Sequence, residues 1–379
     1  MKEKKPSNKK KRGPLRHISA AVATLVIIAV ALVLFMYRDK LSSQGLQALF
    51  GGSNSSAPKG EAYSYETGSN EFFAAAGNGF AIASGSGMQL LDSDGLTVAK
   101  QIFSLSTPAV ATSGVNCAFY DVGGSTLRIA NFNGLITNLD STAPIISVSV
   151  NADGWLAVVS EGSGTKSLVT IYNPDLTPVF KWPSGSAYVL SAQVSPDNKS
   201  MAALTVSSSG GGVTLFSLSS VEPKASFTSG SELFIDLKYI SQNRLCAISE
   251  NRIIMLDANL EEQGSYDFGG LYLTDYSLDG SGFAAVLLGK YRSGNAGILV
   301  TIGQDGSILG ELDIQRDLVS LSASGNNLLA YYSDELVLYS QDLTQKGSHQ
   351  DVVGIRGALL REKGDCILLS SYSAQVLKF

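Results

Sequence analysis

Residues 195–205 read SPDNKSMAALT, in which a polar turn of Ser, Asp and Asn runs directly into small and apolar residues. Asp, Asn and Ser are typical of turns, and the run that follows suits a strand packed in a core. The same order recurs along the chain, which is the signal of a repeat architecture. Its eight copies are AAGNGFAIAS, TSGVNCAFYD, NADGWLAVVS, SPDNKSMAALT, SQNRLCAIS, LDGSGFAAVLL, SGNNLLAYYS and REKGDCILLS.

The copies follow one another at 37 to 46 residues when they are aligned on the small residue early in the strand. Most copies continue into a third apolar run, such as MQLLDSDG, and a fourth, more polar run. Four strands in such a period make one blade of a β-propeller. The sequence therefore predicts an all-β, eight-bladed β-propeller, with seven blades as the alternative if one copy is degenerate. The aligned residues are Ala81, Ala118, Ala157, Ala202, Ala247, Ala284, Ala330 and, as the one exception, Ile367.

The last copy stops after its third run, around 374–379, and would leave an open sheet edge. A strand-like segment, EAYSYET at 61–67, precedes the first copy. We expect this segment to supply the missing outer strand, so that the propeller comprises 61–379 and its two ends close the ring.

The repeat resembles the WD40-like and quinoprotein-like propeller superfamily over roughly residues 61–379. SPDNKSMAAL is similar to the blade turn of Tol-B-like and WD40-like repeats, and LLDSDG and VTIGQDG resemble the third strand and turn of quinoprotein-like repeats. The Gly-His and Trp-Asp signatures of true WD40 repeats are missing. The tryptophan docking motif of quinone-binding dehydrogenases is missing as well, so we expect no pyrroloquinoline quinone and no other cofactor.

Ahead of the repeats, Ile18–Tyr37 forms a run of twenty residues without a charge, a proline or a glycine. As a helix it would span about 30 Å, which is the hydrocarbon thickness of a bilayer. A cleaved signal peptide is the alternative, but the run is longer than a signal core and no small-residue cleavage site follows it. The sequence predicts an uncleaved transmembrane helix at 18–37.

The flanks of this run predict its orientation. Eight Lys or Arg residues precede it in a basic tail at 1–17, while only Arg38 and Lys40 follow closely. The positive-inside rule then keeps the N-terminus cytoplasmic and the C-terminal domain extracytoplasmic. Residues 38–60, rich in Ser and Gly, read as a flexible linker. The whole chain resembles uncharacterised membrane-anchored propellers of Gram-positive bacteria, a resemblance that implies location but no activity.

Charge and composition exclude several functions. Residues 1–40 carry ten basic and two acidic side chains, a net of +8, so the total of −5 leaves −13 on residues 41–379. An acidic domain repels polyanions, and we expect no nucleic-acid partner. His17 and His349 are the two histidines, which excludes a multi-histidine metal site. The three cysteines fall at core positions of the repeat, where they act as small hydrophobes and form no disulfide framework.

The predicted inner strands align Ser147, Ser191, Asp236, Asp275, Ser320 and Gly357 at one position. Asp236 and Asp275 lie in adjacent blades. If the position faces the central channel, two carboxylates share one wall and could do acid–base work or hold a cation. The alternative is structural, with each carboxylate accepting hydrogen bonds from the backbone of a neighbouring blade.

Aromatic and Arg side chains on the loops between blades are the other candidates, because such residues anchor recognition surfaces. Most of them belong to the later copies, which indicates one preferred face. His349 reads as an exposed loop residue, and Asp92, Asp94 and Asp305 read as turn residues and not as calcium ligands. The loop candidates for ligand binding are Trp182, Tyr272, Tyr291, Arg292, Arg316 and Tyr372.

Three functions remain open at this point. The first is a membrane-anchored, extracytoplasmic binding or scaffold protein that presents a propeller face to an envelope protein or a cell-surface ligand. The second is a hydrolase or lyase of the propeller type that uses channel carboxylates such as Asp236 and Asp275. The third is a structural subunit of a membrane or envelope complex. The fold hosts all three, and the sequence holds no catalytic constellation, so a binding protein without enzymatic activity is favoured.

The predicted topology is tested by cysteine labelling in intact cells. A membrane-impermeant thiol reagent should modify a Ser55→Cys variant and leave a Ser7→Cys variant unmodified, because only the linker lies outside. The reverse pattern would invert the orientation that the basic tail predicts.

Overall fold

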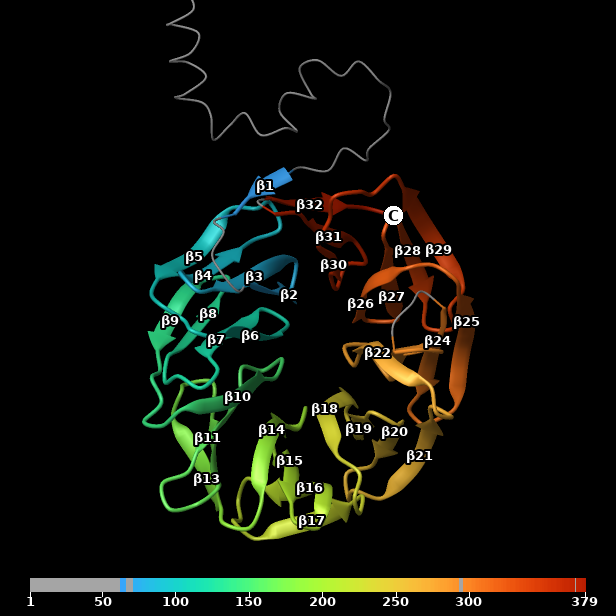
Figure 1. Cartoon of the computed structure of the whole chain (residues 1–379). Helices are drawn as coiled ribbons and strands as arrows, with labels where there is room; N and C mark the ends of the chain where they lie inside the picture. The colour runs from blue at the N-terminus through green and yellow to red at the C-terminus, as the bar shows by residue number, and fades with distance from the viewer. Residues whose placement is uncertain (1–61, 66–70, 293–295, 372) are drawn as a thin grey trace, which may run out of the picture. The chain divides into compact units, whose positions relative to one another are not determined.

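The computed structural model describes residues 62–65, 71–292, 296–371 and 373–379. These residues form eight four-stranded antiparallel sheets, each a blade, and the prediction of an eight-bladed propeller is confirmed. Figure 1 shows the blades as a ring around a central opening, with the innermost strand of each blade beside the opening. In seven blades the first strand in sequence is innermost and the next strands follow outward in chain order, whereas in the eighth blade β30 is innermost and β1 is outermost.

The first four blades run from residue 72 to residue 228. Their strands are β2 (Phe72–Ala76), β3 (Gly79–Ser84), β4 (Gly87–Leu91) and β5 (Thr97–Ile102); β6 (Pro108–Ser113), β7 (Asn116–Asp121), β8 (Leu127–Asn131) and β9 (Gly134–Asn138); β10 (Ile145–Val150), β11 (Leu156–Glu161), β12 (Ser167–Tyr172) and β13 (Pro178–Ser184); and β14 (Tyr188–Val194), β15 (Ser200–Ser207), β16 (Gly210–Ser217) and β17 (Pro223–Thr228).

The last four blades complete the ring. Their strands are β18 (Phe234–Ser241), β19 (Arg244–Ser249), β20 (Arg252–Leu256) and β21 (Glu262–Asp267); β22 (Tyr272–Ser277), β23 (Phe283–Gly289), β24 (Gly297–Gly303) and β25 (Ile308–Ile314); β26 (Leu318–Ser324), β27 (Asn327–Tyr332), β28 (Glu335–Ser340) and β29 (Gln345–Gln350); and β30 (Gly357–Leu360), β31 (Cys366–Leu369) and β32 (Ser373–Leu377) with β1 (Ala62–Ser64).

The core lies between the blades, because each sheet buries both of its faces against its neighbours. The second strand of a blade is its most buried element, and in β23 every residue is buried. The three cysteines lie in second strands and are fully buried, as the repeat predicts. Burial raises the pKa of the Cys117 thiol to about 12, so this thiol stays protonated and unreactive near neutral pH.

The ring closes by joining the two ends of the propeller. β1 pairs antiparallel with β32, which places Ala62 opposite Gln375 and Ser64 opposite Ser373. The buried Tyr65 donates a hydrogen bond from its hydroxyl to the carbonyl of Ser370. The eighth blade is thus built from both ends of the chain, and its outer strand is the earliest described segment of the sequence.

Two arginines tie blade 8 to blade 1 across this junction. Arg356 forms an ion pair of 2.6 Å with Glu71, whose side chain is buried. Arg361 is itself buried, holds Asp365 through two hydrogen bonds of 2.8 and 2.6 Å, and donates a third to the carbonyl of Asn78. A guanidinium satisfied on several sides tolerates burial, so these polar contacts add to the apolar cluster between the two blades, which includes Phe80 and Ile367.

No helix among the described residues has the length and apolarity needed to cross a membrane. The predicted span at 18–37, the tail at 1–17 and the linker at 38–60 lie outside the described residues. Of the predicted closing segment 61–67, residues 62–65 are described.

Ring closure is tested by two deletions. Removal of residues 61–67 takes away β1 and the buried Tyr65, and should lower the stability of the propeller by at least about 2–3 kcal/mol. Removal of residues 42–52 should leave the melting temperature of the propeller unchanged. Equal melting of the two deletion variants would show that β1 does not hold the ring closed.

Candidate functional site

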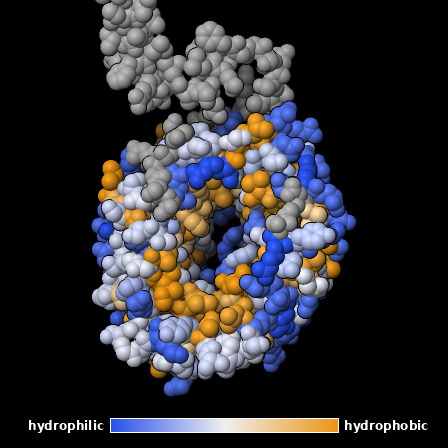
Figure 2. Space-filling view, viewed as in Figure 1, coloured by the Kyte–Doolittle hydropathy of each residue, from blue (hydrophilic) through white to orange (hydrophobic). Residues whose placement is uncertain are grey.

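The propeller has two faces that differ in their loops. We call the side on which the inner strands begin the front face; it carries the loops between blades and the turns between second and third strands. The opposite side, the back face, carries the remaining turns. Figure 2 views the front face, where apolar surface gathers along part of the rim of the central opening. Exposed apolar side chains on one face are informative, because soluble domains rarely group them.

Besides Phe72 at the start of β2, six exposed side chains at this rim belong to four consecutive blades. Each of the six is between 39% and 55% exposed and lies in the first residues of an inner strand or directly before it. We refer to this set as the apolar arc: Tyr188, Leu190, Leu233, Ile235, Tyr272 and Val319.

A β-bulge explains why these inner strands turn apolar side chains outward. In β18, Phe234 pairs with Ser249 and Asp236 pairs with Ile248, so Ile235 is an extra residue. An extra residue rotates the side chains around it and re-aims one of them. Phe234 accordingly points into the core while Ile235 is half exposed. The same bulge recurs in five consecutive blades, with the extra residues Ile146, Leu190, Ile235, Thr274 and Val319.

The residue after each bulge is the aligned position that includes the two acids. Asp275 accepts a hydrogen bond of 3.0 Å from the backbone N–H of Leu321 in the next blade, and one of 2.8 Å from the N–H of Tyr276. Ser320, one blade further on, accepts a bond of 3.4 Å from the N–H of Ala358. The structure thus gives Asp275 the structural role that was one of the two alternatives.

A second row of bonds lies two residues further along the same strands. The hydroxyl of Ser277 accepts a bond of 3.1 Å from the N–H of Ala323, and that of Ser322 accepts one of 2.9 Å from the N–H of Leu360. Short polar side chains on one inner strand therefore satisfy the free backbone N–H groups of the next inner strand.

Asp236 and Asp275 line different cavities. Asp236 lies in the wall of a central cavity of about 610 Å³, beside the Lys238–Asp279 ion pair, and takes a 3.4 Å bond from the hydroxyl of Tyr276. Asp275 lies in the wall of a separate cavity between blades 6 and 7. The arrangement of both carboxylates on one channel wall is therefore not found. Burial raises the pKa of each carboxyl group above its ordinary value.

The cavity between blades 6 and 7 opens on the front face and has a volume of about 490 Å³. Arg316 at this cavity stacks on the ring of Tyr332, with 3.7 Å from its guanidinium carbon to the ring centroid, and pairs with Glu335 at 2.5 Å. These contacts fix the guanidinium. The other lining residues are Thr274, Asp275, Leu287, Gly289, Ala296, Gly297, Ile314, Asp317, Leu318, Val319, Ser320 and Leu321.

The structure brings four of the predicted loop residues together on the front face of blades 6 and 7. Tyr272 opens β22, and the guanidinium of Arg292 stacks on its ring at 5.4 Å. Tyr291, in the same turn as Arg292, is 70% exposed. Arg316 lies in the loop that leads into β26. Tyr372 lies outside the described residues.

The predicted placement of Trp182 in a loop was wrong. Trp182 lies within strand β13, not in a loop, and its ring packs on Phe216 of the next blade with centroids 4.5 Å apart. It is one of the partly buried residues that seal the core between blades 3 and 4.

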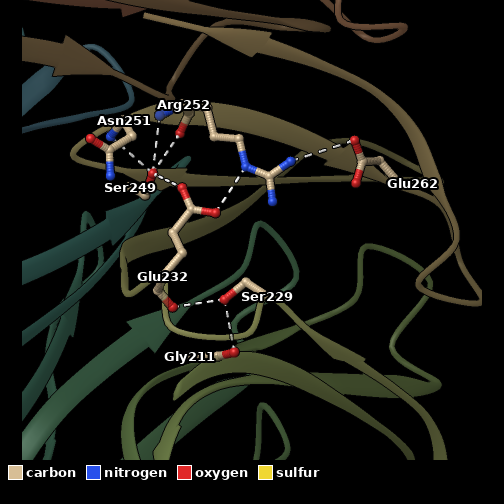
Figure 3. Close-up of polar contacts among 7 residues, drawn as sticks. All are labelled: Gly211, Ser229, Glu232, Ser249, Asn251, Arg252 and Glu262. Atoms are coloured by element: carbon tan, nitrogen blue, oxygen red, sulfur yellow. Dashed lines mark hydrogen bonds and ion pairs between the residues drawn. The ribbon is translucent and has the colours of Figure 1, made fainter. Parts of the chain in front are cut away.

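A polar network that the sequence did not indicate holds the loop that leads into β18 (Figure 3). The carboxylate of Glu232 accepts bonds from the hydroxyl of Ser249 and from Arg252, the latter at 2.8 Å. Ser229 donates to the carbonyls of Glu232 and Gly211 at 2.7 and 3.0 Å. The network anchors the residue immediately before Leu233, so this part of the arc rests on a fixed loop.

The apolar arc was also missed. A signal was present, because Leu190, Ile235 and Val319 each directly precede an aligned position of the inner strand. This signal can be interpreted only when the strand register is known, because strict alternation along the strand would direct these apolar residues into the core.

The remaining polar candidates have structural roles. Asp92 accepts two bonds of 2.9 Å from backbone N–H groups of its own turn, as expected for a turn residue. His349, expected in an exposed loop, is half-buried on the outer strand β29, and its ring nitrogen lies 2.9 Å from the carbonyl of Lys378. Across the described part of the chain, no group of three or more His, Cys, Asp or Glu side chains could hold a metal ion.

The fold resembles that of solved WD40 propellers. The C-terminal WD40 domain of Sif2 matches with a TM-score of 0.56 at 14% identity, over 85% of this chain and 98% of that domain. The propeller domain of Cps50 (Swd1) from Myceliophteria thermophila matches with 0.51 at 12%, over 73% and 98%. A eukaryotic initiation factor matches with 0.55 at 12%, over 86% of each chain. Identities this low show the fold alone.

Sequence comparison adds one match. The model of a family of unknown function, DUF5711, matches residues 55–356. No curated protein sequence matches the chain.

The structural role of Asp275 is tested by substitution. Asp275→Ala should cost about 1–3 kcal/mol, because the N–H of Leu321 loses its acceptor. Asp275→Asn keeps an acceptor oxygen and should cost less. Asp317→Asn, an exposed neighbour, should change stability by less than about 0.5 kcal/mol. Urea unfolding of the three variants gives these values, and equal stability of Asp275→Ala and the unsubstituted protein would contradict the role.

The same variants carry a pH test. Since burial raises the pKa of Asp275, the folded state binds this proton more tightly than the unfolded state does. The resulting stabilisation is complete below the ordinary carboxyl pKa of about 4 and is lost as pH rises through the raised value. Unfolding measured from pH 3.5 to 7 should show a smaller loss for Asp275→Asn than for the unsubstituted protein.

Proposed function

The chain belongs to the DUF5711 family of unknown function, and we propose that it is a membrane-anchored, extracytoplasmic binding or scaffold protein that docks a partner on its front face. The observation that carries the proposal is the run of five consecutive bulges, in three of which the extra residue is an exposed aliphatic side chain at the rim of the opening: Leu190, Ile235 and Val319. A bulge interrupts the pairing of two strands. Five bulges at equivalent positions of consecutive inner strands therefore indicate a shared function.

The free energy of burying apolar side chains favours a partner that covers this surface. An exposed Leu or Ile gains about 1.5–3 kcal/mol when it is fully buried, and the arc offers Leu190, Leu233, Ile235 and Val319 with two tyrosines. The tyrosines add rigid aromatic area of the kind that dominates protein interfaces. Stacking of Arg292 on Tyr272 holds one of these rings in place.

Geometry counts against the hydrolase or lyase alternative. That alternative used Asp236 and Asp275 as a pair, and the two carboxylates line separate cavities. Both oxygens of Asp275 already accept backbone N–H groups.

Membrane anchoring belongs to the same proposal and is supported by the sequence. Residues 18–37 would span the bilayer with the basic tail in the cytoplasm, and residues 38–60 would tether the propeller outside. β1 runs antiparallel to β32 and toward the front face, so its first residue, Ala62, lies at the back-face end of the strand.

Copurification from membranes tests the docking face. The intact chain and a Leu233→Ser/Ile235→Ser variant are crosslinked in membranes of the cells that produce it, and crosslinked partners are identified. The variant should lose the partners that the unsubstituted chain retains, because polar replacements remove the apolar contact. Retention of the same partners by this variant would contradict the proposal.

A matched control removes the same amount of exposed apolar surface elsewhere. Val221 and Ile308 are 64% and 48% exposed and lie at turns of the back face. A Val221→Ser/Ile308→Ser variant should keep the partners. Thermal melts of both variants establish that each propeller is folded.

A further inference from the structure

We propose that the docked partner presents an apolar peptide segment with a lysine or arginine, whose basic side chain enters the cavity between blades 6 and 7. The inference rests on the proposed function, because it names the chemistry of the partner that the front face receives. Three features carry it: the continuity of the cavity with the arc, the charge balance of its walls and the charge of the whole domain.

The cavity is continuous with the apolar arc. Two of the five bulged residues, Thr274 and Val319, line its wall, and Val319 is also a member of the arc. A peptide that covers the arc over blades 4 and 5 therefore reaches the cavity by continuing along the rim. At about 490 Å³ the cavity is large enough for one long side chain.

The walls of the cavity leave two negative charges uncompensated. Three charged residues line it: Asp275, Arg316 and Asp317. The guanidinium of Arg316 is neutralised by Glu335 at 2.5 Å and lies on the ring of Tyr332. None of the ion pairs found among the described residues includes Asp275 or Asp317. A cation entering the cavity would therefore meet two carboxylates that lack a cationic partner.

The shape of a Lys or Arg side chain suits the rest of the lining. Its methylene stem would lie along Leu287, Ile314 and Leu318, while its charged end reaches the carboxylates. Asp275 uses both oxygens for backbone N–H groups, but a carboxylate has about four acceptor positions, so it can accept a further donor. Burial disfavours its ionised form, and a bound cation would reverse that preference.

Long-range electrostatics act in the same direction. Residues 41–379 carry a net charge of −13, so a basic segment is attracted to the domain and an acidic one is repelled. An acidic segment would also bring a carboxylate beside Asp275 and Asp317. Like charges at an interface disfavour a partner, so this occupant is the less favourable one.

A random-peptide phage library panned against the intact chain in lipid nanodiscs tests the inference. Enriched sequences should combine apolar residues with a Lys or Arg. A synthetic peptide of the enriched sequence should bind an Asp275→Asn/Asp317→Asn variant at least about tenfold more weakly, because the paired charge is lost. The same peptide with Lys→Met should be insensitive to this double substitution.

Two further variants separate charge from folding. Asp334→Asn/Asp351→Asn removes the same charge from exposed front-face positions outside the cavity and should weaken binding by less than about threefold. Ala296→Leu fills the cavity without a change of charge and should weaken binding of the basic peptide as much as the loss of the two carboxylates does.

The outcomes distinguish this inference from the proposed function. Enrichment of acidic peptides, of peptides without a basic residue, or of no peptide overturns the inference. Basic peptides that resist both cavity variants but are lost on Leu233→Ser/Ile235→Ser also overturn it and leave the docking face intact. Peptides that bind the Leu233→Ser/Ile235→Ser variant unchanged contradict the docking face itself.

Discussion

The unpaired edge of each inner strand is the constraint on which the rest of the propeller depends. An inner strand pairs on one side only, and its free N–H groups face the neighbouring blade across the rim of the opening. Water reaches them poorly, so acceptors must come from the protein. Asp275, Ser277, Ser320 and Ser322 provide those acceptors from one blade to the next. In blades 6 and 7 the residue at the aligned position thus links its inner strand to the next one, whereas Ser147 and Ser191, at the same position of blades 3 and 4, have no hydrogen-bond partner for their hydroxyls.

The bulge connects this constraint to the front face. Adding one residue before the aligned position keeps the acceptor directed at the next blade and turns the added side chain outward. Ile235 and Asp236 show both effects within one step of the chain, since the first is exposed and the second is half buried at the cavity wall. The bulge, repeated from blade 3 to blade 7, therefore contributes Leu190, Ile235 and Val319 to the apolar arc, and Thr274 and Val319 to the wall of the cavity between blades 6 and 7.

Period and turn chemistry were sufficient to predict the number of blades, the burial of the cysteines and the strand that completes blade 8. They are local properties, readable from residues such as those of SPDNKSMAALT. The candidate site was harder to predict because it depends on register. Trp182 stands beside Pro183 and close to Gly185, which suggested a loop, yet pairing with Val169 keeps it in β13. Asp236 and Asp275 align in sequence and both follow a bulge, yet they line different cavities.

The closing strand has a mechanical consequence. β1 is the outermost strand of its blade and the first described segment of the sequence, so tension along the preceding chain reaches β1 before any other strand. Its three residue pairs with β32 are therefore the first strand contacts of the ring to break under such tension. A pull along β1 strains all three pairs at once, whereas a sideways pull breaks them one after another at lower force. Each of the other seven blades consists of four consecutive strands, so the release of β1 leaves their strand pairing unchanged.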